Sequence, residues 1–185
     1  MSADQISNAI QNSPYFTGVR ESGLLYPVIL SSHLTMIAIF GGLILLTDLR
    51  LLNVAMKSVP ASVVVAKTRP LKYVGLTIML LLGIHLGGAK FNDYYDNPYF
   101  LMKMSLLVCV FIHAMVFRKS VYKNPAALDS PGGPPGAAKV AATLSLVIWV
   151  SILSCGRMIA YWDDPSNQPG KAPLLTPGQV YGRSK

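Results

Sequence analysis

The sequence contains three histidines, His33, His85 and His113, and each of them lies within a long apolar stretch. Histidine can serve as an axial ligand of haem, as a ligand of a metal ion or as a carrier of protons. An ionisable side chain is costly inside a membrane, so it usually faces the interior of a helix bundle, where it has a partner. The three histidines are therefore the first candidates for a functional site.

Depth in the membrane separates the three histidines, because an α-helix rises 1.5 Å per residue. His33 lies roughly 14 Å from the outer end of its stretch and His113 roughly 15–21 Å, whereas His85 lies only about 6 Å deep. His33 and His113 can therefore meet near the middle of the membrane across a porphyrin, and we prefer them as the pair of ligands. His33 and His85 form the alternative pair, which requires a shift or tilt of the helices.

Two basic residues near the outer end of their stretches add to this site. Arg157 lies close to the end of the last apolar stretch, and Lys103 lies near the start of the third. Together they could pair with the propionates of a haem whose carboxylates point outward. Alternatively, Arg157 extends its charge to the membrane surface and has only a structural role.

Glycines accompany two of the histidines. Gly41 and Gly42 follow His33 by about two helical turns, and His85 lies between Gly83 and Gly87. Small residues would admit a flat macrocycle between helices. The GxxxG spacing around His85 is nevertheless more typical of close helix packing than of a cofactor site.

The elements that must position these residues are membrane-spanning helices. The chain is 52% hydrophobic and only 13% charged, and its apolar residues gather in four blocks. Each block is long enough to cross a hydrocarbon layer, which takes about 20 residues as a helix. We predict an all-α integral membrane protein, a four-helix bundle whose spans cover about 24–46, 71–89, 99 or 103 to 117, and 140–161. Pro70 is taken as the stop that precedes the second span.

The chain divides into one domain and two tails. Residues 24–161 form the bundle, residues 1–23 are a polar N-terminal tail with a possible helix along the membrane surface, and residues 162–185 are an extended C-terminal tail. The segment 124–138 is rich in proline and glycine, so it is predicted to be a loop without a core of its own.

The distribution of basic residues predicts the orientation of the bundle. The two loops on one side carry nine lysines and arginines. The other side has seven, of which three lie far from any span. Both termini are therefore expected to face outward, N-out and C-out, into the periplasm from a bacterial inner membrane. The basic residues flank the apolar blocks, so the partner that they indicate is membrane lipid and not nucleic acid.

Several kinds of chemistry find no support in the sequence. There is no CxxCH for a covalently attached haem and no HExxH for a zinc hydrolase. Cys109 and Cys155 lie singly in apolar surroundings, and the methionines are scattered through the helices, as is typical of packing residues. We expect a subunit that carries electrons rather than an enzyme by itself.

Short strings in the chain resemble those of a known group. They are Leu30-Ser31-Ser32-His33-Leu34, Thr47-Asp48-Leu49-Arg50-Leu51-Leu52-Asn53, Asn97-Pro98-Tyr99-Phe100, and Cys155-Gly156-Arg157-Met158-Ile159-Ala160-Tyr161. On these strings the chain resembles a widespread family of uncharacterised bacterial four-span membrane proteins. That family is distantly similar to the copper-resistance D proteins and to the membrane protoporphyrinogen oxidases. The resemblance covers most of residues 24–161.

The resemblance implies a set of functional residues. The related groups have a histidine in the first span and a lysine and a histidine in a later one. His33, Lys103 and His113 match this pattern, whereas His85 lies outside it. The resemblance therefore supports the His33–His113 pair.

These observations favour a membrane subunit that binds one haem b and carries electrons within a larger respiratory or electron-transfer complex. Its partners would be other subunits, reached through the two tails, and a quinone. An alternative cofactor is chlorophyll, because a single histidine can hold its magnesium. A third possibility is an accessory scaffold without a redox role, and a fourth is transport of copper or protons.

Overall fold

Four long helices form the main body of the protein. The computed structural model describes residues 2–162, without the side chains of residues 119, 120 and 122. Each long helix contains a stretch that is long and apolar enough to cross a membrane, and the described residues include no β-strand. The predicted all-α, four-span architecture is confirmed. The helices are α3 (Leu25–Leu51), α4 (Ala61–Ala89), α6 (Pro98–Tyr122) and α8 (Gly136–Trp162).

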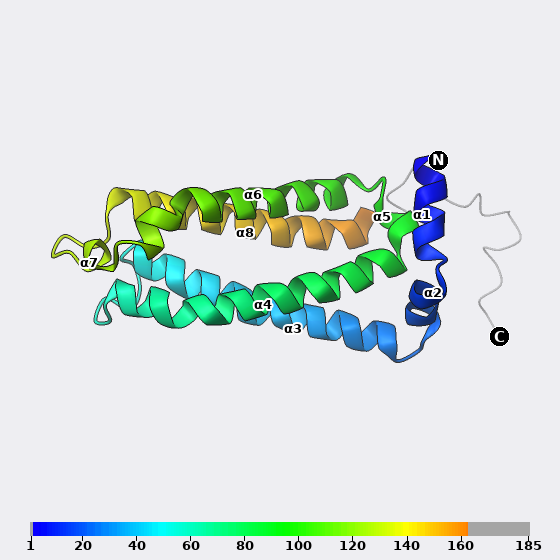
Figure 1. Ribbon diagram of the computed structural model, residues 1–185, viewed down its shortest axis with the longest axis horizontal. Helices are drawn as coiled ribbons and strands as arrows, with labels where there is room; N and C mark the ends of the chain where they lie inside the picture. The colour runs from blue at the N-terminus through cyan, green and yellow to red at the C-terminus, as the bar shows by residue number, and fades with distance from the viewer. Residues whose placement is uncertain (1, 163–185) are drawn as a thin grey trace, which may run out of the picture.

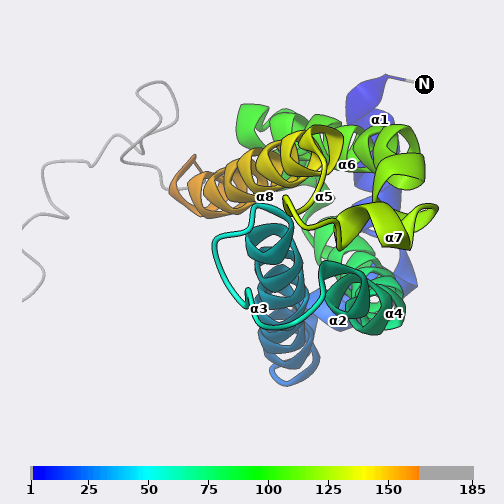
Figure 2. The same ribbon diagram turned by 90° about the vertical axis from the view of Figure 1, so that its left-hand side faces the viewer.

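The four helices form two antiparallel pairs (Figure 1). Helix α3 packs along α4, α6 packs along α8, and the contact between α3 and α8 joins the two pairs. Helices α4 and α6 make little contact with each other. Figure 2 views the bundle from the end that carries the α3–α4 and α6–α8 connections, which we call the loop end. The opposite end, where α3 begins and α8 finishes, is the terminal end.

A cluster of large side chains fills the middle of the bundle. Phe40 of α3, Met79 of α4, and Trp149 and Ile152 of α8 are buried together there. The outward faces of the same helices are apolar and exposed, as at Ile84 and Met115, which are 63% and 78% exposed. Apolar side chains that face away from the core are expected where lipid surrounds the bundle.

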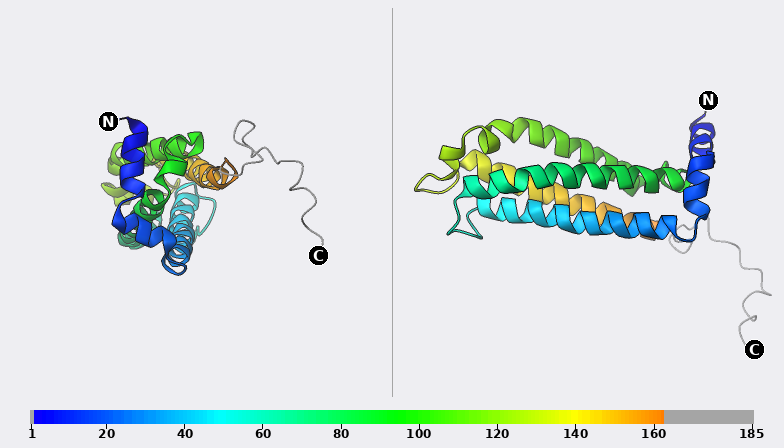
Figure 3. Two further views of the ribbon diagram at one scale, coloured as in Figure 1. Left: turned by 90° about the vertical axis from the view of Figure 1, so that its right-hand side faces the viewer. Right: turned by 60° about the horizontal axis from the view of Figure 1, so that its bottom comes forward.

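Three short helices cover the terminal end (Figure 3). They are α1 (Ala3–Gln11), α2 (Pro14–Glu21) and α5 (Phe91–Tyr94). Helix α1 begins with a capping box between Ser2 and Gln5, and α2 begins with Ser13 as its N-cap and Pro14 in its first turn. These signals satisfy backbone N–H groups that would otherwise lack partners. The predicted helix in residues 1–23 is therefore present as two helices.

The loop end is more ordered than the sequence suggested. The segment 124–138 contains a short helix, α7 (Pro125–Leu128), and Leu128 is only 1% exposed within a core cluster at this end. The next residue, Asp129, accepts hydrogen bonds from the backbone N–H and the hydroxyl of Ser62 at the start of α4. The loop was predicted to have no core of its own, and Leu128 packs instead into the core that the ends of the long helices form.

Two predicted span boundaries need correction. Helix α4 starts at Ala61 and runs through Pro70, which was taken as its stop. A proline removes one backbone hydrogen bond, and α4 continues as a helix on both sides of it. Helix α6 starts at Pro98, where the side chain of Asn97 accepts hydrogen bonds from the N–H groups of Tyr99 and Phe100. The expected C-terminal tail lies, after Trp162, outside the described residues.

Candidate functional site

His33 lies in the interior of the bundle, on the side of α3 that faces α4. A Cβ placed on Gly83 of α4 would come within 3.3 Å of His33 Cε1. The ring also forms a hydrogen bond with the backbone of Met79 on the same helix. Its Nδ1 atom is buried and has no hydrogen-bond partner. Buried ring nitrogens normally have a partner, so this atom is a candidate ligand position within the membrane-spanning region.

Lys103 of α6 reaches the same region from the other pair of helices. Its ammonium group interacts electrostatically with His33 and with the thiol of Cys155 on α8. Its Nζ also lies 3.6 Å from the position that a Cβ on Gly156 would occupy. The absence of a side chain at Gly83 therefore lets the imidazole pack close to the backbone of α4, and Gly156 lies beside the ammonium group. His33 and Lys103 were both predicted as site residues, and the structure brings them together.

The register of the helices explains this meeting. Trp149 of α8 packs against Gly41 of α3, and the two helices run antiparallel. Eight residues toward the terminal end lead from Gly41 to His33 on α3 and from Trp149 to Arg157 on α8. Equal steps on antiparallel helices keep the same level, so His33 is level with the Gly156–Arg157 turn that Lys103 contacts.

His113 lies at a different level and has other partners. It follows Lys103 by ten residues on α6, which is roughly 15 Å along the helix axis. Its Nε2 is 2.9 Å from the carbonyl oxygen of Ala141 on α8, and its ring packs against Phe117 at a centroid distance of 5.0 Å. The structure therefore places His113 in the α6–α8 contact and does not bring it to His33.

His85 belongs to the cover at the terminal end. Its Nδ1 lies 2.7 Å from the carbonyl oxygen of Leu81, one turn earlier in α4. Its ring lies 5.8 Å from the ring of Tyr15 on α2. His85 thus contacts the N-terminal helices and not the interior in which His33 lies.

Arg157 points away from the bundle interior. Its side chain is exposed, and its guanidinium donates a hydrogen bond of 3.0 Å to the hydroxyl of Tyr161. The guanidinium carbon also lies 4.7 Å from the centroid of the Tyr161 ring. These contacts match the structural alternative for Arg157, which leaves Lys103 as the inward-facing cation at the level of His33.

The glycines near the histidines play separate roles. Gly83 faces His33, whereas a Cβ on Gly87 would meet nothing within 4 Å. Gly88 is covered by the ring of Phe16 of α2, which leaves no room for an added Cβ. The GxxxG spacing of Gly83 and Gly87 is therefore not a symmetric packing motif, since only its first glycine touches another helix.

The surroundings of His33 fit one axial ligand of a haem. The ring offers a buried nitrogen without a competing bond, and the facing helices contribute glycines where the backbone is close. Lys103 supplies a positive charge for a propionate. The described residues hold no cluster of three or more histidine, cysteine or acidic side chains that could bind a bare metal ion. Both cysteines are free thiols, Cys109 exposed and Cys155 buried.

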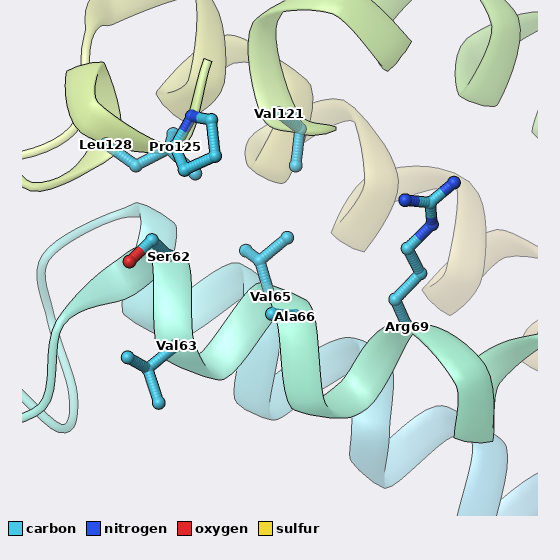
Figure 4. Close-up of a pocket in the computed structure, with 8 residues that line it drawn as sticks. All are labelled: Ser62, Val63, Val65, Ala66, Arg69, Val121, Pro125 and Leu128. Atoms are coloured by element: carbon cyan, nitrogen blue, oxygen red, sulfur yellow. The ribbon is translucent and has the colours of Figure 1, made fainter. Parts of the chain in front are cut away.

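Two cavities lie away from His33, one at each end of the bundle. The cavity at the loop end has a volume of about 260 Å³ and opens between α4, the end of α6 and α7 (Figure 4). Arg69 stands at one side of it, and its floor is apolar. The cavity at the terminal end, of about 390 Å³, is lined by Tyr99, Met158, Tyr161 and Trp162.

A buried polar cluster near the loop end was missed by the sequence analysis. Asp48 follows the predicted end of the first span at about residue 46, yet α3 continues to Leu51 and Asp48 is only 6% exposed. Lys72 of α4 and Ser145 of α8 lie beside its carboxylate. The available signal was polar residues near the predicted span ends, Thr47 and Asp48 just beyond the first span and Thr68 and Lys72 at the start of the second.

The comparisons with known proteins identify a family and nothing closer. No curated protein and no solved structure matches this chain. The model of one family, described as a family of unknown function (DUF6644), matches residues 15–162, which include all four long helices and the three histidines. The chain belongs to the DUF6644 family.

Proposed function

We propose that this protein is a b-type haem-binding subunit that carries electrons within a larger membrane complex. The observation that supports the proposal is the imidazole of His33, which is buried in the bundle with an unbonded Nδ1. Leaving a polar atom without a partner in such a place costs free energy. A bound ligand that uses this nitrogen would remove that cost.

In this proposal His33 is the axial ligand and Lys103 is the partner of a propionate. Bound haem supplies one-electron redox chemistry, and the protein contributes the ligand, the low-polarity surroundings and the neighbouring positive charge. Gly83 and Gly156 keep the site free of side chains where the helices are closest. Cys155, buried beside Lys103, completes the polar lining.

The second axial position is the part of the proposal that differs most from the sequence-based preference. His113 lies roughly 15 Å farther along α6 than Lys103 and is bonded to the Ala141 carbonyl. We propose a haem held by His33 alone among the histidines. The distant similarity to copper-resistance D proteins and membrane protoporphyrinogen oxidases would add His113 as a second ligand, and a substitution can decide between the two.

The N-terminal helices present the surface on which we expect a partner subunit to bind. The helices α1 and α2 cover the terminal end and expose Ile6 and Tyr15, which are 45% and 58% exposed. We propose that this face docks another subunit on the periplasmic side of a bacterial inner membrane, with both termini facing outward. A quinone is the proposed small-molecule partner for electron exchange.

Visible spectra of the purified protein, before and after reduction with dithionite, test the proposal. We expect a b-type α-band on reduction, its loss in His33→Ala, and its retention in His85→Ala. A far-red band that does not respond to reduction would instead identify chlorophyll. A protein that stays colourless after expression with ample haem would leave the scaffold role as the better account.

The spectrum of His113→Ala separates the two ligand assignments. If His33 is the only histidine ligand, the haem stays bound and its spectrum is unchanged. If the α-band is lost in both His33→Ala and His113→Ala, the His33–His113 pair favoured by the sequence is correct. The position of α6 along its axis must then differ from that in the structure. Helix content measured by circular dichroism controls for loss of the fold.

A further inference from the structure

Five polar side chains lie together near the loop end, within the membrane-spanning helices. Thr47 and Asp48 come from α3, Thr68 and Lys72 come from α4, and Ser145 comes from α8. Thr47, Asp48 and Thr68 are buried, at 1%, 6% and 6% exposed. Polar and ionisable groups are rare at such positions and usually serve a function.

Hydrogen bonds connect most of this polar cluster. The hydroxyls of Thr47 and Thr68 lie 3.0 Å apart, and Lys72 Nζ donates to Thr47 Oγ1 over 3.3 Å. The two threonines are also anchored to their own helices, to the carbonyls of Leu43 and Val64. Ser145 hydrogen-bonds to the Asp48 carboxylate, and Lys72 interacts with it electrostatically.

One atom of the cluster stands out, because Asp48 Oδ2 is buried and has no hydrogen-bond partner. A buried carboxylate usually accepts several hydrogen bonds, and an unsatisfied one carries a large desolvation cost. A proton on Oδ2 would neutralise the carboxylate and remove its need for further hydrogen-bond donors. The alternative is a permanent ion pair with Lys72, which keeps both charges buried.

The other charged groups nearby are directed elsewhere. Arg50, two residues farther along α3, points its guanidinium at the Val59 carbonyl and the Asn53 side chain. His113 of α6 is bonded to Ala141, one turn before Ser145 on α8. Among the described residues, Lys72 is therefore the charged group that acts on the Asp48 carboxylate.

We propose that Asp48, together with Lys72 and Ser145, is a proton-binding site that exchanges protons with the water at the loop end. Asp48 lies within one turn of the end of α3, roughly 5 Å along the axis, so the path to that water is short. The carboxylate takes up one proton from water and returns it, and no electron or other reactant takes part. The site is separated from His33 by fifteen residues of α3, about 23 Å, and it does not depend on the haem proposal.

Infrared difference spectra recorded as a function of pH test this proposal on the full-length protein in lipid nanodiscs. We expect a protonated-carboxyl band that appears between about pH 8 and pH 5, where unburied aspartates stay ionised. Asp48→Asn should remove the band, and Asp129→Asn should leave it in place, because Asp129 is an exposed carboxylate near the same end. Lys72→Met should give a stronger band than the wild type at neutral pH, because it removes the charge that favours the ionised form.

An unchanged spectrum in Asp48→Asn, with no protonated-carboxyl band that appears in that range, would overturn the proposal. If Asp48→Asn does not fold, wild-type protein labelled with ¹³C at the aspartate carboxyls gives the same answer. A band that shifts with the label and titrates in this range supports the proton site, and its absence contradicts it.

Discussion

The indole of Trp149 lies directly against Gly41, so that a Cβ at this glycine would come within 2.6 Å of Trp149 Nε1. This contact fixes how α8 passes α3, and α3–α8 is the interface that joins the two helix pairs. The edge of the Phe40 ring meets the same indole at a centroid distance of 5.2 Å. The levels of His33 on α3 and of Gly156 on α8 relative to each other follow from this crossing.

Gly41→Ala should therefore destabilise the bundle by roughly 1–3 kcal/mol, the usual cost of adding a methyl group to a filled core. Gly42→Ala is the matched control, because nothing lies within 4 Å of its added Cβ. Thermal unfolding in detergent, followed by circular dichroism, measures both. Equal stability of the two variants would mean that Trp149 does not rest on Gly41.

Gly88→Ala should release the N-terminal helices from α4. The ring of Phe16 covers Gly88 so closely that an added methyl group forces the ring to move. We expect faster hydrogen exchange in residues 3–21 and little change in the four long helices. Gly87→Ala, which meets open space, should leave the exchange unchanged, and a similar effect of both substitutions would contradict the α2–α4 contact.

Asp129→Asn should weaken the start of α4, whose own N-cap, Pro60, provides no side-chain cap. The hydrogen bond from the Ser62 hydroxyl holds the pKa of Asp129 below its ordinary range. This contribution is present above the ordinary pKa of aspartate and is lost as the pH falls through the lowered value. The exposed cap contributes on the order of 0.5–1 kcal/mol.

The stability of the wild type should accordingly fall more steeply on acidification than that of Asp129→Asn. Urea unfolding in mild detergent, measured at neutral and at acidic pH, gives the comparison. Parallel pH profiles would show that the Asp129–Ser62 contact does not persist in solution.

Tyr95 should ionise at higher pH than an ordinary tyrosine. Its hydroxyl donates a hydrogen bond to Asp4 of α1, and this bond raises the pKa of Tyr95. The stabilising contribution is present below the ordinary pKa of tyrosine and is lost as the pH rises through the raised value. The difference in ultraviolet absorbance between wild type and Tyr95→Phe isolates this residue, and Asp4→Asn should move its titration back toward the ordinary pH.

The four spans were predictable because apolar blocks of this length form few structures other than membrane-spanning helices. The start of the third span was harder, and it decided the ligand pairing. Asn97 and Pro98 form an N-cap followed by a first-turn proline, so α6 begins one residue before the predicted range. His113 then lies roughly 22 Å from the start of α6, against about 12 Å for His33 in α3, and the apparent common level disappears.

The meeting of His33 with Lys103 could not be read from the sequence, because it depends on how two helix pairs cross. Gly41 and Gly83 were recognised as small residues near histidines, but nothing local says which helix each one faces. The Asp48 cluster was missed for a related reason. Thr47, Asp48 and Thr68 lie outside the predicted spans, and only the longer α3 and α4 bring them into the bundle beside Lys72 and Ser145.

The haem content of the purified protein tests the central claim most directly. Protein isolated in native lipid should contain about one haem per chain by the pyridine haemochrome assay, and His33→Ala should contain almost none while His85→Ala matches the wild type. A folded wild-type protein without haem, or a His33→Ala variant that retains the full haem content, would contradict the assignment of His33 as the axial ligand.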